Sequence, residues 1–213
     1  MAQTVAALTE NIRVALADSE DHRFSDANIL VFLNKAYRKI HGVFTHNRPE
    51  LIKAVATGTT VAGTADIKLS SGSFQRILSL HVDELEIKDI GQEPSGAYES
   101  TDYGFPKGFY ISAWDTVTLV PKPDDAYAYR LAYVARPTAL TSGASTTWPD
   151  DFDDLMEEFT VMRLGIIDEG DPSAEAQFLQ DIEMRAKVLL GDLAPHPGFI
   201  QSYWSVPTVR SAY

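Results

Sequence analysis

The fold is set by residues 24–40, FSDANILVFLNKAYRKI, a stretch that predicts a long amphipathic helix. Ser25 is a good N-cap, and Asp26 follows it at the positive end of the helix dipole. Pro49 marks the expected end of the helix. The apolar face recurs at helical spacing and comprises Ile29, Phe32, Leu33, Ala36, Tyr37, Ile40, Val43 and Phe44. We therefore expect this helix to bury one face in the core.

One shorter helix is expected before this segment, and two more near the end of the chain. Residues 3–17 carry a first stripe of Val5, Leu8, Ile12 and Leu16. Asp171-Pro172 provides an N-cap and a proline suited to the first helical position, so it separates the last two helices. Their stripes are Phe152, Leu155, Met156, Phe159, Met162 and Ile166, then Phe178, Leu179, Ile182, Ala186 and Leu189. The last helix is expected to end near Gly191.

Between residues 51 and 140 the apolar period changes from 3.6 to 2, which is typical of strands. Short runs are separated by glycine-containing turns, and residues 92–107 read as a long exposed loop. The runs are 66–70, 76–82, 85–90, 108–112, 116–120 and 127–134. With no helix between them, they predict an antiparallel meander or small sandwich.

The element order predicts an α+β fold. We expect an antiparallel bundle of about four helices from residues 1–50 and 148–193, with an inserted antiparallel β-sheet domain at 51–147. Residues 194–213 are expected to form an extended C-terminal arm. Both ends of the chain would then build one helical domain.

Composition narrows the classes of function. The 213 residues include no cysteine, which excludes disulfides and thiolate chemistry. No apolar run reaches the roughly 20 residues of a membrane span, and the N-terminus lacks the features of a signal peptide, so we expect synthesis in a cytoplasm. The net charge of −12 argues against tight binding of nucleic acid.

No catalytic or cofactor motif is present. The five histidines show no metal-ligand spacing, and phosphate-binding loops, dinucleotide fingerprints and nucleophile elbows are absent from the sequence. We therefore expect no cofactor and no metal. One acidic cluster could supply paired carboxylates or bind calcium: Asp150, Asp151, Asp153, Asp154, Glu157 and Glu158. A structural role at a helix N-terminus is the favoured interpretation.

The C-terminal segment LAPHPGFIQSYWSVPTVRSAY is aromatic and almost uncharged, unlike a solvated tail. It is either a strap on its own subunit or an arm that anchors in a neighbouring protein. The candidate contact residues are Pro197, Phe199, Ile200, Tyr203, Trp204, Val206 and Tyr213.

Three motifs in order resemble the head-to-tail adaptor (connector) proteins of tailed bacteriophages. The helix FSDANILVFLNKAYRKI is similar to their Ser-Asp-x-x-apolar-apolar-x-x-apolar-Asn pattern. FPKGFYISAWDTVTLVPKPDDAYAYRLAYVARPTAL follows their Pro-x-x-aromatic, strand, Pro-x-Pro, strand arrangement, and TTWPDDFDDLMEEFTVMRLG resembles the entry to their third helix. The resemblance covers roughly residues 7–190.

The resemblance implies a structural, non-enzymatic virion protein at the head–tail junction. Such adaptors form rings, commonly of twelve copies, that bind the portal protein and extend the DNA channel without binding the passing double-stranded DNA tightly. The bundle would meet neighbouring copies, the β part would face tail tube, nozzle or hub proteins, and the arm would reach the portal.

The acidic residues Glu157, Glu158, Asp168 and Glu169 would line the channel or face solvent. Two other functions stay open. One is another ring-forming tail protein, a tail-completion or tube-terminator subunit. The other is a carboxylate-dependent cell-wall glycosidase.

Overall fold

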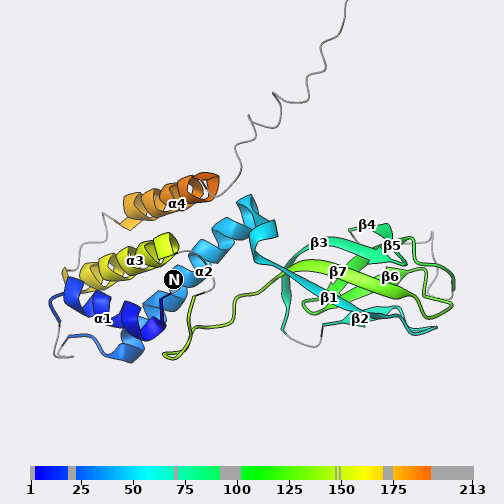
Figure 1. The fold of residues 1–213 in the computed structure, drawn as a ribbon, viewed down its shortest axis with the longest axis horizontal. Coiled ribbons are helices and arrows are strands. Elements are labelled where there is room, and N and C mark those ends of the chain that lie inside the picture. Colours follow the sequence, from blue (N-terminus) through cyan, green and yellow to red (C-terminus); the bar gives the residue numbers. More distant parts are fainter. Residues whose placement is uncertain are drawn as a thin grey trace, which may run out of the picture. The chain divides into compact units, whose positions relative to one another are not determined.

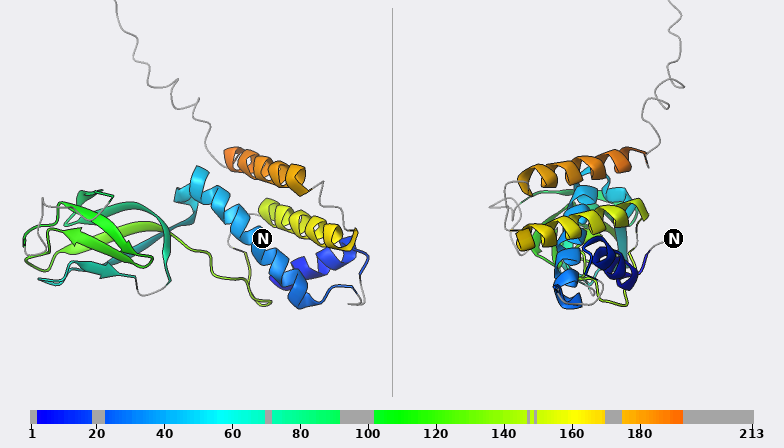
Figure 2. Two further views of the ribbon diagram at one scale, coloured as in Figure 1. Left: turned by 180° about the vertical axis from the view of Figure 1, so that it is seen from behind. Right: turned by 90° about the vertical axis from the view of Figure 1, so that its left-hand side faces the viewer.

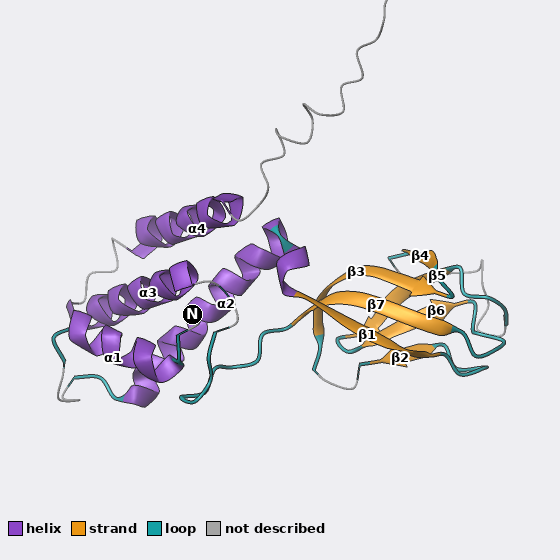
Figure 3. Ribbon diagram, in the orientation of Figure 1, coloured by secondary structure: helices purple, strands orange, loops and turns teal. Residues whose placement is uncertain are grey.

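The computed structural model describes residues 3–18, 23–69, 72–91, 102–146, 148, 150–169 and 175–192. Within the helices, the side chains of Asp150, Asp168, Glu169, Asp192 and residues 175–177 are outside this description. The chain forms two compact units. We call residues 1–47 and 139–213 the helical unit and residues 48–138 the β unit (Figures 1 and 3). The fold is α+β.

The helical unit contains α1 (Val5–Ala15), α2 (Asp26–Asn47), α3 (Asp150–Glu169) and α4 (Glu175–Asp192). α3 packs against α1, α2 and α4, and α2 also contacts α1 and α4 (Figure 2). The expected helix at residues 3–17 is confirmed as α1, and the expected helix after Ser25 is confirmed as α2. Residues 170–174 and the expected cap at Asp171-Pro172 lie outside the described residues.

The buried face of α2 differs in part from the predicted stripe. Phe32 and Tyr37 are only half-buried, whereas His41 and Thr45 are buried. Thr45 can be buried because its hydroxyl donates to the His41 carbonyl oxygen at 2.8 Å, one turn earlier. Apolar periodicity therefore located the face but missed the polar side chains within it.

The β unit begins with a short 3₁₀ helix (Pro49–Ile52) and contains seven strands in one curled sheet (Figure 1). The strands are β1 (Lys53–Thr59), β2 (Asp66–Lys68), β3 (Phe74–Val82), β4 (Leu85–Asp89), β5 (Gly108–Ala113), β6 (Thr116–Val120) and β7 (Ala128–Ala135). Their order in the sheet is β1-β7-β3-β4-β5-β6-β2. β1 was not among the predicted runs.

The prediction of an antiparallel meander is wrong in two respects. β7 lies between β1 and β3 and β2 lies beside β6, so several neighbouring strands are not consecutive in the sequence, and one pair is parallel. β4 and β5 pair in parallel, with Lys88 opposite Gly108 and Asp89 opposite Phe109, whereas the other ladders between described strands are antiparallel. A parallel pair needs a long connection between its strands. Here the connection includes the expected loop at residues 92–107, of which residues 92–101 lie outside the described residues. Period 2 identifies a strand but does not identify its partner.

The core of the β unit is a single cluster of buried side chains from β2 to β7, which includes Leu80, Val117 and Leu131. β1 pairs with β7, Lys53 opposite Val134, so the chain enters and leaves the unit on adjacent strands. This arrangement suits a domain inserted within another.

Candidate interaction surfaces

A buried arginine ties the end of α1 to the start of α2. Arg13 is 5% exposed, and its Nη2 donates to Asp26 Oδ1 at 2.6 Å. Arg13 Nη1 also lies 3.6 Å from a carboxylate oxygen of Asp18. Asp18 accepts hydrogen bonds from the backbone N–H groups of Arg23 and Phe24, at 3.1 and 2.9 Å. The acidic residue after Ser25 therefore holds α1 against the start of α2.

Asn34 ties the middle of α2 to the segment that returns from the β unit. Its Nδ2 donates to the Leu140 carbonyl oxygen at 3.1 Å, and the Leu140 N–H donates to its Oδ1 at 2.7 Å. Ser25 Oγ accepts from the Asn28 N–H at 3.3 Å and so caps the same helix. The polar positions of the Ser-Asp…Asn pattern thus each have a structural partner.

Asp153 is the centre of a buried polar network at the start of α3. Its side chain is fully buried. Its Oδ2 accepts from Thr146 Oγ1 at 2.9 Å and from the Gln3 N–H at 3.2 Å, and its Oδ1 accepts from Trp148 Nε1 at 3.2 Å. The Trp148 ring stacks on Phe44 with a centroid distance of 5.4 Å. One carboxylate therefore joins the N-terminus, the loop before α3 and α3 itself.

The two predicted acidic-face residues with described side chains have partners within the chain. Glu157 is half-buried; burial raises the pKa of its carboxyl, while a hydrogen bond with Asn11 opposes this shift. Glu158 accepts from Arg185 Nη2 at 2.9 Å and from Nη1 in a second, short contact, so it links α3 to α4. The Asp168 and Glu169 side chains lie outside the described residues.

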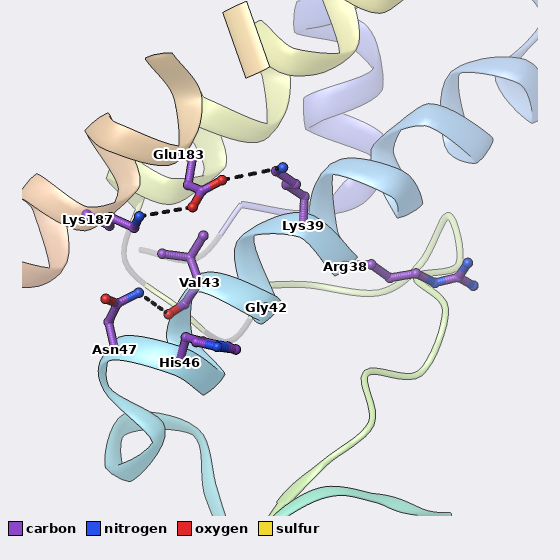
Figure 4. A pocket seen from close by; sticks show the side chains of 8 residues that line it. All are labelled: Arg38, Lys39, Gly42, Val43, His46, Asn47, Glu183 and Lys187. Atoms are coloured by element: carbon purple, nitrogen blue, oxygen red, sulfur yellow. Dashed lines mark hydrogen bonds and ion pairs between the residues drawn. The ribbon is translucent and has the colours of Figure 1, made fainter. Parts of the chain in front are cut away.

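Two grooves run along α4. The first, the α2–α4 groove, has a volume of about 430 Å³ and is lined by the basic side chains Arg38, Lys39, His46 and Lys187 and by Glu183 (Figure 4). The second, the α3–α4 groove, has a volume of about 340 Å³. It is lined by Asp151, Asp154, Glu158 and Arg185, and by the apolar Leu155, Val188 and Leu189. Both grooves lie within the helical unit.

The protein-family model described as "SU10 adaptor protein" matches residues 3–197. The chain belongs to this family. The resemblance to phage head-to-tail adaptors is thereby confirmed. A comparison with curated proteins gives no match.

Family membership makes this chain a phage adaptor and a component of the virion. An adaptor interacts with other phage head and tail proteins. The family is structural, which implies a non-enzymatic role. Within the described part of the chain, no helix has the length and apolarity needed to span a membrane.

The acidic cluster of the adaptor has mostly structural surroundings. Asp153 is enclosed by its donors and Glu158 is bound by Arg185. Asp151 and Asp154 are exposed. No group of three or more histidine or acidic residues that could hold a metal occurs among the described residues. The sequence prediction gave Asp153 the same role at a helix N-terminus as its acidic neighbours, although the donors at Thr146 and Trp148 just before it were a signal for its burial.

The seven residues predicted to form the C-terminal arm lie outside the described residues. The structure therefore describes surfaces of the helical and β units, and the arm stays a prediction.

Proposed function

We propose that this adaptor forms a ring between the portal and the tail and extends the DNA channel. The family match over residues 3–197 carries this proposal. In this assignment residues 1–50 and 148–193 form an antiparallel bundle that meets neighbouring copies. The inserted residues 51–147 face the tail tube, nozzle or hub proteins, and residues 194–213 reach the portal.

The aromatic character of the arm supports its assignment to the portal. Tyrosine and tryptophan bury much area at interfaces, and this segment carries almost no charge that would have to be desolvated. Truncation after Leu193 should leave both units folded and abolish stable attachment to the portal. Normal attachment by the truncated protein would contradict this role.

The acidic residues Glu157, Glu158, Asp168 and Glu169 are proposed to limit contact with DNA. If they line the channel, repulsion of phosphate keeps DNA from adhering during passage. Charge reversal at these positions should then slow DNA ejection. Unchanged ejection kinetics would place this face toward solvent.

Native mass spectrometry of the adaptor mixed with the portal protein of the same phage tests the proposed ring. The portal is needed because ring subunits can stay monomeric until a template is present. We expect one discrete complex with about one adaptor per portal subunit, twelve copies in a twelvefold portal. Absence of the complex in mild salt would contradict the portal assignment and favour a tail-completion or tube-terminator protein.

A further inference from the structure

The α2–α4 groove carries an excess of positive charge. Arg38, Lys39 and Lys187 share it with one carboxylate, that of Glu183. Glu183 lies 3.0 Å from Lys187 Nζ and 3.6 Å from Lys39 Nζ, and Arg38 extends away from these three side chains (Figure 4). Arg38 forms no hydrogen bond or ion pair with any described residue. Three cations against one anion leave two positive charges in a chain whose net charge is −12.

The α3–α4 groove carries the opposite excess. Asp151, Asp154 and Glu158 share it with one cation, Arg185, which is bound to Glu158. Asp151 and Asp154 are exposed and have no hydrogen-bond or ion-pair partner in the described part of the chain. Three anions against one cation leave two negative charges, which equals the excess in the other groove.

The two grooves lie on different sides of the same helix. Glu183 and Lys187 line the groove toward α2, and Arg185 and Val188 line the groove toward α3. At 100° per residue, Met184 falls between these two sides. Met184 and Val188 are each 59% exposed and one turn apart, which gives α4 an apolar outer surface beside both grooves.

We propose that the α2–α4 groove binds a second copy of this chain, through Asp151 and Asp154 at the start of that copy's α3. Each copy then presents an acidic patch on one side of α4 and a basic patch on the other. Contact between two different patches is heterologous and can close into a ring, whereas contact between two identical patches gives a dimer. The complementary charges would set which surfaces meet. This proposal rests on the proposed ring and names its subunit contact.

Charge exchange tests the contact in the full-length protein with its portal. In one variant, Arg38→Glu and Lys187→Glu reverse the charge of the groove. In the other variant, Asp151→Lys and Asp154→Lys reverse the charge of the acidic patch at the start of α3. Each variant alone should lose the portal-bound complex seen by native mass spectrometry. An equimolar mixture should restore it, because in an even-numbered ring of alternating variants each reversed groove faces a reversed patch and each unaltered groove faces an unaltered patch, so every contact pairs opposite charges. Restoration would also show that both variants fold.

Matched reversals at exposed positions serve as controls. Glu10→Lys on α1 and Lys88→Glu on β4 change charge by the same amount per residue and lie outside both grooves. They should leave the complex intact. Circular dichroism should give native helix content for every variant.

The possible outcomes distinguish a failure of this proposed contact from a failure of the proposed ring. If the unaltered protein forms no portal complex, the proposed ring fails. If it forms one and both reversed variants do so equally well, or if the reversed variants are folded and mixing restores nothing, the ring stands and this contact is wrong. If groove reversal leaves the complex intact but lowers retention of a DNA duplex on a filter, the groove binds phosphate and the proposal is overturned.

Discussion

The network around Asp153 allows the stability of the helical unit to be predicted in some detail. Asp153→Ala leaves the donors of Gln3, Thr146 and Trp148 in a site from which water is excluded. Each buried donor that is left without an acceptor costs about 1–3 kcal/mol. With three donors affected, we expect Asp153→Ala to lower the free energy of unfolding by roughly 3–5 kcal/mol.

The isosteric variant Asp153→Asn sharpens the test. Both carboxylate oxygens accept from N–H donors, Oδ2 from Gln3 and Oδ1 from Trp148. Whichever oxygen is replaced, the new NH₂ group faces a donor. The loss should therefore be about 1–3 kcal/mol, that of one unsatisfied buried group.

Urea unfolding followed by circular dichroism measures these differences in the helices. With an m value of about 1–3 kcal/mol/M, a loss of about 4 kcal/mol moves the midpoint by more than about 1 M. Asp154→Asn is the matched control, because Asp154 is the exposed neighbour. It should change the unfolding free energy by less than about 1 kcal/mol, the size of a helix-dipole effect. Equal effects of Asp153→Ala and Asp154→Asn would refute the assigned role of the network.

Three further outcomes are expected. Asn34→Ala removes both hydrogen bonds to the backbone of Leu140 and should lower the free energy of unfolding by about 1–3 kcal/mol in the same urea assay. An unfolding free energy equal to that of the unaltered protein would contradict this. The pKa of Tyr127 is raised to about 12, chiefly by the hydrogen bond that its hydroxyl donates to Asp124, so Asp124→Asn should lower this pKa in an ultraviolet absorbance titration. Since the folded pKa exceeds the ordinary tyrosine pKa of 10.0, the contribution of this group to stability is present below about pH 10 and is lost as the pH rises through 12. Glu157→Gln should stabilise the protein at pH 7 and have no such effect below pH 4.5, because burial raises the pKa of this carboxyl and disfavours its charged form; unfolding at the two pH values checks the sign.

The elements that could be predicted from the sequence are those with local signals. α2 has a cap at Ser25 and a strong apolar period, so its start was predicted to the residue. β1, Lys53–Thr59, was missed because its sequence KAVATGT holds small side chains that hardly differ in polarity between the two faces. The parallel pairing of β4 with β5 was missed because partner choice depends on contacts far apart in the sequence.

The polar contacts were harder to predict than the helices. Asn34 was recognised as part of a pattern, but its partner Leu140 lies 106 residues away. Asp153 stands among exposed acids, and only the fold brings Gln3 to it. The acidic cluster at the start of α3 was visible in the sequence, whereas the basic groove that α2 and α4 form together required the structure.

The contacts between the N-terminal residues and residues 144–145 have a consequence for folding during synthesis. The Val5 N–H donates to the Ala144 carbonyl oxygen at 2.9 Å, and Thr4 forms an isolated β-bridge with Ser145. On the ribosome α1 is made long before these partners, so it must wait while the whole β unit emerges. The β unit is continuous in sequence and can complete its own contacts first, as domains generally fold as units during translation. The helical unit would then close last, after α3 has left the exit tunnel.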